Sequence, residues 1–375
     1  MSRTMLPVVE GGAARGATRR DVTARFRAKL TANVTRLMRR SEGVARQFMP
    51  SVEELEEYGG TETPFEEGKD NRGIYGLERI YEDRAVLTPY FDCSAYCRYC
   101  FKKTRTLAGD GRAMTPEDVD RAIAYIAADP RIRIVLVTGG DPLVRPELLR
   151  AVLDRAAAIP HVRQLRIGTR NLLFRPELLD DAMADWLASY QRLDPADLAA
   201  SRSLALAVSI NHPDELYPAY VRALRRLLER GVVVRAQVTL LKGVNDDAAT
   251  LRRLYESFAA VGLTPYYLYH CMPVVGARHF RTSVQRGLDL LEELAPLTGA
   301  LAPHYVYVTP VGKHRLGRGA QLEHVERAGR RWIRATTPYR AVDFLAFSDS
   351  EALPPMHEVD AAGRIVSHYP DGEDG

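Results

Sequence analysis

Beyond residue 75 the chain alternates short apolar runs with amphipathic segments of helical period. The apolar runs cover residues 85–89, 132–138, 164–168, 204–210, 232–241 and 264–271. The helical segments cover residues 116–128, 146–158, 176–200, 217–230, 249–260 and 284–297. Continuous apolar strands that alternate with helices are typical of βα units, in which helices cover a buried parallel sheet. We therefore predict an α/β fold, a partial (β/α)6 barrel over residues 75–297, with its site at the carboxyl ends of the strands.

The pattern differs on both sides of this barrel. Residues 1–20 are rich in Gly, Ala and Arg without periodicity, which predicts a disordered leader. In residues 21–74, apolar side chains at helical spacing predict an N-terminal helical region, with a helix pair over residues 21–49 and a short helix from Ser51. Residues 298–375 hold a strand-like run at 304–308, a glycine-interrupted loop and a final αβ stretch, which predict a C-terminal extension.

Composition narrows the class of protein. Hydrophobic residues make up 46% of the chain and charged residues 27%, the balance of a soluble globular protein. No apolar segment approaches the ~20 residues that span a bilayer, and the N-terminus lacks the apolar core of a secretory signal. We therefore expect a reducing cytoplasmic location and no membrane partner. The net charge of +4 is too mild to indicate nucleic-acid binding, and Arg222, Arg225 and Arg226 fall on the polar face of a helix.

Three of the four cysteines, Cys93, Cys97 and Cys100, lie within eight residues in CxxxCxxC spacing. A closed structural zinc site needs four ligands, whereas three thiolates can hold a cubane and leave one iron open. An open iron can bind a small molecule and pass it an electron, as in radical S-adenosylmethionine (SAM) enzymes. Tyr99, just before the last cysteine, fits that family. The alternatives are buried thiols, a disulfide with a spare thiol or part of a zinc knuckle. Cys271 is remote and follows an apolar run, so we expect it to be a core thiol.

Seven segments together resemble the lysine 2,3-aminomutase family of radical SAM enzymes. They occur in order as CSAYCRYCF, VLVTGGDPL, LRIGTR, SINHPDE, AQVTLLKGVND, TPYYLYH and ARHFRT, between about residues 76 and 313. The resemblance implies that the three clustered cysteines hold a [4Fe-4S] cluster, that SAM chelates its open iron, and that reductive cleavage yields a 5'-deoxyadenosyl radical. The residues that the resemblance implies for SAM binding are Gly139, Gly140, Asp141, Asn211, His212 and Gln237.

The family also uses pyridoxal 5'-phosphate (PLP), which allows the amino group to migrate from the α to the β carbon of an amino acid. Lys313 matches the family's PLP lysine, although the glycine run before it is shorter here. The alternative for Lys313 is an exposed surface lysine. Tyr81 and Arg84 resemble the family's phosphate-binding pair, and the rigid fork of arginine suits a phosphate.

The substrate-binding positions depart from the family. The two aspartates that hold the distal ammonium of lysine align with Met272 and Val308, and an apolar pair cannot neutralise a buried cation. We therefore predict a substrate other than free lysine. The carboxylate-binding arginine aligns with Lys102, which would act as a point charge. The family's C-terminal zinc cysteines are absent.

The sequence therefore favours an isomerase, an amino-acid 2,3-aminomutase that uses a [4Fe-4S] cluster, SAM and PLP. We expect an amino acid as substrate, a reducing partner such as flavodoxin or ferredoxin, and a homo-oligomer. A second hypothesis is a radical SAM enzyme on the same scaffold that performs elimination or dehydrogenation without PLP. A third, from another class, is an iron-sulfur electron carrier or a zinc-binding interaction module.

Overall fold

The structure, a computed structural model of the 375-residue chain, describes residues 17–62, 73–109, 111–294, 297, 301–317 and 322–372. A nine-stranded sheet runs in the order β1 to β9, so each strand lies beside its neighbour in sequence. Strands β2 to β8 are parallel, while β1 and β9 are antiparallel strands at the two ends. The predicted α/β partial barrel is therefore confirmed. The parallel strands are β2 (Arg84–Tyr90), β3 (Ile134–Gly139), β4 (Gln164–Thr169), β5 (Ser203–Ser209), β6 (Val233–Leu240), β7 (Thr264–His270) and β8 (Tyr305–Thr309).

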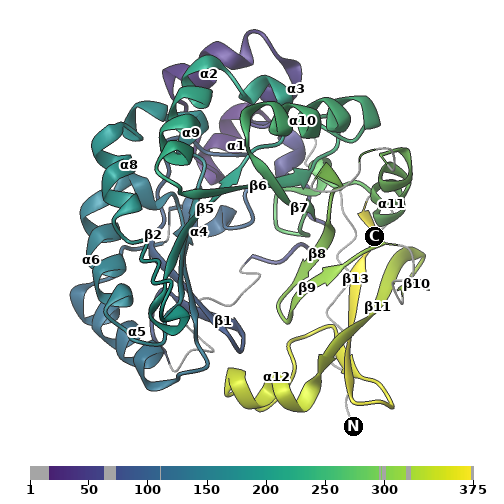
Figure 1. Cartoon of the computed structure of the whole chain (residues 1–375). Helices are drawn as coiled ribbons and strands as arrows, with labels where there is room; N and C mark the ends of the chain where they lie inside the picture. The colour runs from purple at the N-terminus through teal and green to yellow at the C-terminus, as the bar shows by residue number, and fades with distance from the viewer. Residues whose placement is uncertain are drawn as a thin grey trace.

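Each parallel strand from β2 to β7 is followed by a helix on the outer side of the sheet (Figure 1). These helices are α5 (Pro116–Ala128), α6 (Pro146–Ala157), α8 (Asp181–Ala188), α9 (Pro218–Glu229), α10 (Ala248–Val261) and α11 (Val284–Glu293). Thr115 caps α5 with Pro116 as its first residue, and Gly262 ends α10 in the left-handed conformation. The edge strands are β1 (Leu77–Tyr81) and β9 (Gly312–Arg315), and β8 and β9 continue the barrel sheet past residue 297.

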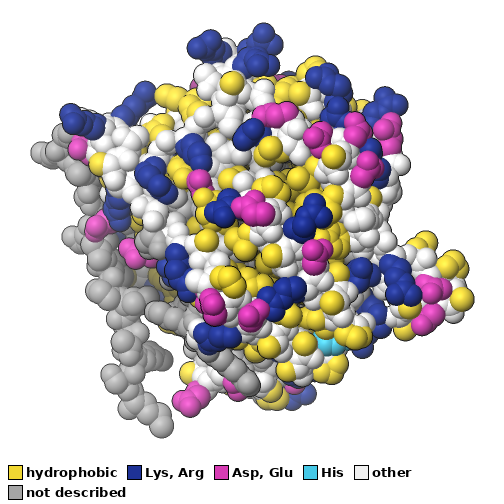
Figure 2. Space-filling model, turned by 90° about the vertical axis from the view of Figure 1, so that its left-hand side faces the viewer, with side chains coloured by type: hydrophobic (Ala, Val, Ile, Leu, Met, Phe, Trp, Pro, Cys, Tyr) yellow, Lys and Arg dark blue, Asp and Glu magenta, His cyan; other side chains and the backbone are white. Residues whose placement is uncertain are grey.

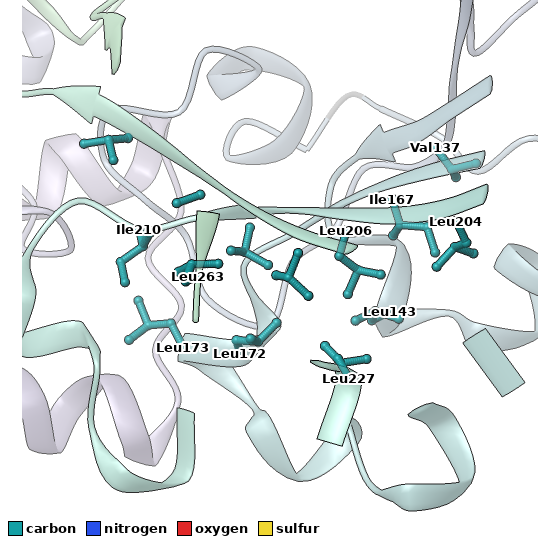
Figure 3. Packing of buried hydrophobic residues seen from close by; sticks show 14 of the residues in the cluster. Val137, Leu143, Ile167, Leu172, Leu173, Leu204, Leu206, Ile210, Leu227 and Leu263 are labelled. Carbon is teal, nitrogen blue, oxygen red and sulfur yellow. The ribbon is translucent and has the colours of Figure 1, made fainter. Parts of the chain in front are cut away.

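The core lies between the outer face of the sheet and the helices. Leu165 and Ile167 of β4 and Leu204 and Leu206 of β5 are fully buried there, against Leu227 of α9 (Figure 3). The intervening strand residues face the inside of the barrel and remain partly exposed, as the alternating burial of β4 and β6 shows. The inside of the barrel is therefore open to solvent.

The long helical segment predicted over residues 176–200 is shorter in the structure. It consists of η3 (Pro176–Leu178), α8, and η4 (Leu198–Ala200). The side chain of Asp194 accepts hydrogen bonds from the backbone of Ala196 and Asp197, so a local turn around Pro195 replaces helix. An isolated bridge between Arg192 and Arg202 then closes this turn.

The N-terminal region forms three short helices rather than the predicted pair. They are α1 (Arg19–Arg25), α2 (Ala32–Met38) and α3 (Glu42–Arg46), followed by the 3-10 turn η1 (Val52–Leu55). Thr18, Thr31 and Ser41 each accept a hydrogen bond as an N-cap, so the chain restarts a helix at each of them. Most of the predicted disordered leader lies outside the described residues, although α1 includes its last two residues.

After β9 the chain forms a second sheet of four antiparallel strands. They are β10 (Leu322–Arg327), β11 (Arg330–Arg340), β12 (His357–Val359) and β13 (Arg364–Pro370), with α12 (Ala341–Ser348) between β11 and β12. Figure 1 shows this sheet beside β8 and β9, with α12 below β1. Val311, at the β8–β9 turn, shares a small core with Phe344 of α12 and Ile365 of β13. The C-terminal residues therefore pack against the barrel edge that carries Lys313.

The outer surface carries both signs of charge. On the face that contains α5, α6 and α8, acidic and basic side chains lie among one another (Figure 2). Arg155 pairs with Asp120, and Arg230 pairs with Asp181 and Asp185. Such interspersed charges give this face no continuous basic surface. In the described part of the chain, no helix is long and apolar enough to cross a membrane.

Candidate active site

The cysteine motif occupies the loop between β2 and the short helix α4 (Lys103–Thr106), at the carboxyl end of the first parallel strand. Cys93, Cys97 and Cys100 are free, partly exposed thiols. Burial raises the pKa of Cys93, and it raises the pKa of Cys100 to about 12. The neighbouring thiols contribute to both shifts. The sulfur atoms are therefore close enough to oppose one another's ionisation. A bound cation would allow all three to bind as thiolates.

The three thiols are one fewer than the ligands of a closed structural zinc site. In the ranges that the structure describes, no three His, Cys, Asp or Glu side chains are gathered as ligands of a single metal ion. A structural zinc ion draws four ligands into one tetrahedron, whereas the cysteines of an iron-sulfur cluster bind different irons. A set of three thiols fits the predicted cluster.

A buried ion cluster beneath this loop joins it to the N-terminal region. Glu54 of η1 lies 2.6 Å from Arg98 and 2.7 Å from Lys103, and all three side chains are almost fully buried. Burial alone would raise the pKa of Glu54, but the hydrogen bond from Arg98 and the charge of Lys103 lower it. Arg98 also donates to the carbonyls of Phe26 and Arg27. The cysteine loop is therefore held by charge-assisted bonds to the N-terminal region.

The glycines at the end of β3 allow the cysteine loop to approach closely. Gly139 has a φ of +122°, and a Cβ added there would lie 2.2 Å from the Thr88 side chain. A Cβ on Gly140 would lie 2.2 Å from the carbonyl oxygen of Asp92, the residue before the first cysteine. The Gly140 amide donates to the carbonyl of Tyr90 at 2.8 Å. Glycine is required at position 140 because the backbone of the cysteine loop fills the space of a side chain, and at position 139 because φ is positive and Thr88 of β2 fills that space.

Asp141 is buried and joins the ends of two strands. Its carboxylate accepts hydrogen bonds from Thr169 Oγ1 at 2.8 and 2.9 Å, from the Arg170 amide at 2.7 Å and from the Leu143 amide at 3.1 Å. Burial raises the pKa of Asp141, although the Arg170 amide and Thr169 act against the shift. These contacts give Asp141 a positioning role, which the prediction of a SAM contact did not include.

Arg170, at the end of β4, is the centre of a buried polar network. Its Nη1 lies 2.8 Å from Cys97 Sγ and 2.5 Å from the Tyr99 hydroxyl. Its Nη2 donates to both oxygens of Glu215 at 3.0 Å and to Gln47 Oε1 at 2.6 Å. Burial would lower the pKa of Arg170, but the charges of Cys97 and Glu215 raise it. A permanent cation therefore lies beside the central cysteine.

Asn211 belongs to the same network. Its Nδ2 donates to Gln47 Oε1 at 3.1 Å and to the Tyr99 hydroxyl at 2.6 Å. Gln237 lies on the inner face of β6, 3.3 Å from the Tyr269 hydroxyl. His212 instead packs on α3: its ring fills the place of a side chain on Gly43, and burial lowers its pKa. Among the residues predicted for SAM, the structure therefore brings Asn211 close to the cysteine motif and leaves His212 against the N-terminal region.

The predicted PLP residues meet at the β1–β9 side of the barrel. Lys313 Nζ lies 5.3 Å from the Tyr81 ring centroid and 5.5 Å from that of Tyr267. The Tyr81 hydroxyl accepts a hydrogen bond from the Lys313 amide at 2.7 Å, and Arg84 stacks on the Tyr81 ring at 4.7 Å. Burial, assisted by the charge of Arg84, lowers the pKa of Lys313 to about 8. Lys313 is thus no freely exposed lysine.

The predicted substrate residues have different surroundings. Val308 pairs directly with Lys313 across the β8–β9 hairpin, so the two side chains lie on the same face. Met272 follows β7 and is partly exposed. Lys102 is buried, and its Nζ lies 2.7 Å from Glu78 Oε1. A substrate carboxylate would have to compete with Glu78, a partner that the sequence did not reveal.

Several proteins of known family resemble this chain. The Radical SAM superfamily matches residues 87–254. Two proteins of Aquifex aeolicus (strain VF5), both named "Putative L-lysine 2,3-aminomutase", are 35% identical over 273 residues (72% of this chain, 70% of that protein) and 32% identical over 335 residues (88% and 85%). This chain belongs to the lysine 2,3-aminomutase family of radical SAM enzymes.

Other members of the family are similarly related. L-lysine 2,3-aminomutase of Clostridium subterminale is 33% identical over 276 residues, which are 72% of this chain and 63% of that protein. Glutamate 2,3-aminomutase of Clostridioides difficile (strain 630) is 31% identical over 238 residues, 63% of this chain and 54% of that protein. A solved radical SAM methyltransferase from Sphaerobacter thermophilus is 20% identical, covers 62% of this chain and 67% of that chain, and has a TM-score of 0.42.

Membership of the lysine 2,3-aminomutase family makes this chain a radical SAM enzyme and implies a [4Fe-4S] cluster and SAM. The assignment of Cys93, Cys97 and Cys100 as the cluster ligands stays a prediction, which their spacing fits. Cys271 is buried in a small core cluster with Leu241, Val244 and Phe280, as predicted for a core thiol.

Sequence reasoning missed the residues that surround the motif. Arg170 and Glu215 belong to the segments LRIGTR and SINHPDE, so their charges at the ends of two strands could have marked them as site residues. Gln47 gave no signal, because it lies in the N-terminal region, 123 positions before Arg170. Glu54 was similarly hidden among other glutamates of its segment.

Proposed function

We propose that this enzyme is a PLP-dependent amino-acid 2,3-aminomutase, an isomerase that moves an amino group from the α to the β carbon of an amino acid other than free lysine. The observation that carries the proposal is the half-buried position of Lys313 next to two tyrosine rings and Arg84, on the barrel whose carboxyl end carries the cysteine motif. A surface lysine would have neither the low pKa nor these neighbours.

At the carboxyl end of the barrel, Cys93, Cys97 and Cys100 would hold the cluster. Gly140 allows the start of the cysteine loop to pack against the end of β3, and Arg170 places a positive charge next to Cys97. SAM bound there would supply a 5'-deoxyadenosyl radical after one-electron reduction. The loop, fixed through Arg98 and Glu54, presents the three thiols in a constant arrangement.

At the β1–β9 side, Lys313 would bind the aldehyde of PLP. Condensation needs the neutral amine, and a pKa of about 8 makes a substantial fraction neutral near physiological pH. Tyr81 and Tyr267 flank the amine, and Arg84 is positioned to bind a phosphate. PLP would supply a conjugated aldehyde that condenses with the amino nitrogen of the substrate, with loss of water, and carries that nitrogen as it moves between carbons.

The substrate side of the proposal rests on Val308 and Met272. Val308 lies on the same face of the hairpin as Lys313, so it borders the space next to the lysine amine. A distal ammonium placed against an apolar side chain would lose hydration without gaining a counter-charge. We accordingly expect lysine to be a poor substrate.

The proposal includes a low-potential donor such as flavodoxin or ferredoxin as electron source, because cleavage of SAM consumes one electron. We further propose that the enzyme is a cytoplasmic homo-oligomer without nucleic-acid or membrane partners. The mixed charges of the outer surface support the absence of a nucleic-acid partner.

The decisive experiment treats reconstituted enzyme with PLP and borohydride, followed by peptide mapping. We expect a pyridoxyl group on Lys313, and none in Lys313→Ala or in Lys313→Arg, which keeps the charge. The reduced enzyme, given SAM and a panel of amino acids, should form a β-amino isomer. Formation of 5'-deoxyadenosine without PLP attachment and without an isomer would favour the PLP-free elimination or dehydrogenation reaction instead.

A further inference from the structure

Two arginines inside the barrel contact the same tyrosine ring. Arg166 of β4 and Arg235 of β6 lie with their guanidinium carbons 5.2 and 5.1 Å from the ring centroid of Tyr266 on β7. Arg166 Nη2 also donates to the Tyr266 hydroxyl at 3.0 Å. Since β4 and β7 are not neighbours in the sheet, this contact crosses the interior of the barrel.

The strand pattern shows why these side chains point inward. In β4 and β6 the residues next to the arginines, Ile167 and Ala236 among them, are buried in the core against the helices. The arginines therefore lie on the opposite, inner face. Tyr266 is the extra residue of a bulge, because Ala236 pairs with Pro265 and Gln237 with Tyr267. The bulge brings Tyr266 and Tyr267 together, with ring centroids 4.0 Å apart.

Neither arginine has a carboxylate partner in the described part of the chain. Arg166 has the Tyr266 hydroxyl as its hydrogen-bond acceptor, and Arg235 makes a ring contact alone. The acidic group nearby, Asp83, forms two hydrogen bonds with Arg84, at 2.8 and 3.0 Å. Arg170, by comparison, is paired with Glu215. A half-buried guanidinium normally has a counter-charge, so the inner face has an excess of positive charge here.

Neighbouring side chains add to this excess of positive charge. The charges of Arg84 and Arg166 both act on Lys313, and Lys313 in turn acts on Tyr266. Burial would raise the pKa of Tyr266, but hydrogen bonds from Tyr267 and Arg166 lower it. Four cationic side chains thus face one carboxylate in this part of the barrel. Guanidinium forks bind phosphate and carboxylate oxygens in pairs, which suits an anionic ligand group.

We propose that Arg166 and Arg235, whose guanidinium groups both lie over the ring of Tyr266, form an oxyanion-binding site inside the barrel. Its ligand is either the phosphate of PLP or the side-chain carboxylate of an acidic amino-acid substrate. Both place an oxyanion next to two guanidinium groups, close to Lys313. The site itself follows from the geometry, whereas the assignment of its ligand rests on the proposed aminomutase function.

The first test measures binding of inorganic phosphate to the full-length protein by isothermal titration calorimetry. Arg166→Gln and Arg235→Gln should each weaken binding about tenfold or more, the loss expected for a charged hydrogen bond. The control is Arg225→Gln, an exposed arginine that pairs with Glu229 on the surface of α9. Arg235→Lys keeps a positive charge and should recover part of the affinity. If all variants bind phosphate as the control does, the site is overturned, whatever the enzyme's reaction.

The second test identifies the ligand. If the phosphate of PLP occupies the site, Arg235→Gln weakens binding of PLP and leaves binding of pyridoxal unchanged. If a substrate carboxylate occupies it, PLP binding is unchanged, and the KM for glutamate or aspartate rises while that for leucine does not. Unfolding midpoints equal to the wild type show that the variants are folded. The proposal is refuted if neither PLP affinity nor the preference for acidic substrates changes.

Discussion

Replacing Glu54 with glutamine removes the only carboxylate from the buried cluster with Arg98 and Lys103 described above. Both cations then lack a counter-charge, with Glu54 and Arg98 fully buried and Lys103 1% exposed in the native protein. Removing one partner of a buried ion pair typically costs about 3–5 kcal/mol of unfolding free energy. Arg98 cannot release its proton, whereas Lys103 can, so Lys103 limits the cost by becoming neutral.

This difference predicts a pH dependence with a definite sign. Burial lowers the pKa of Lys103 to about 8 in the native protein, below its unfolded value, so wild-type stability rises with pH only above about pH 8. Without Glu54 the pKa of Lys103 falls further, and the variant already gains stability between pH 7 and 8. The destabilisation by Glu54→Gln should therefore decrease by about 1.4 kcal/mol between pH 7 and pH 8 and stay constant above pH 8.

Urea unfolding followed by fluorescence of the two tryptophans measures these values at pH 7, 8 and 9. Glu53→Gln is the matched control, because its carboxylate contacts Ser51 next to the buried pair rather than the cations. The double variant Glu54→Gln/Lys103→Met removes the surplus cation and should be more stable than Glu54→Gln alone. A destabilisation below 1 kcal/mol that does not change with pH would refute the reasoning about this cluster.

Three further predictions concern the cysteine loop and Lys313. Cys97→Ala should abolish reductive cleavage of SAM, measured as 5'-deoxyadenosine, whereas Cys271→Ala should keep it; full cleavage by the first variant would remove Cys97 from the cluster ligands. Gly140→Ala should lower the iron content, and it should lower the free energy of unfolding by about 1–3 kcal/mol because the added methyl group overpacks against Asp92. Gly317→Ala, whose Cβ meets nothing within 4 Å, should change neither quantity. The rate of PLP attachment should rise with pH through about 8 and then level, as the Lys313 amine becomes neutral; a flat profile would contradict the assigned pKa.

The hydrophobic pattern along the sequence was enough to predict the barrel, but not how the N-terminal region packs against it. The strands β3 to β7 could be predicted because the side chains that face the helices are apolar and buried, as Leu165 and Ile167 of β4 are. In the N-terminal region, apolar residues at helical spacing predicted helices but not where each helix begins and ends. Its short helices are fixed by contacts with distant segments, such as Gln47 with Arg170 and Glu54 with Arg98, and these contacts leave no periodic signal.

The same distinction explains which site residues could be predicted. The cysteines and the glycines were visible because each requires a residue type that little else can replace: a thiolate, or an absent side chain. Lys102 shows the opposite case, since its role depends on Glu78, a residue 24 positions away whose proximity only the fold creates.

Arg170 combines both cases. Its place at a strand end was readable, but its 2.8 Å contact with Cys97 depends on Gln47, Glu215 and Tyr99, which hold the guanidinium in place. If Cys97 is a cluster ligand as predicted, a positive charge fixed there would favour the reduced cluster, because hydrogen bonds to cysteine sulfur and nearby charge tune the reduction potential of iron-sulfur centres. Gln47 and Glu215 would then influence the electron-accepting step through Arg170.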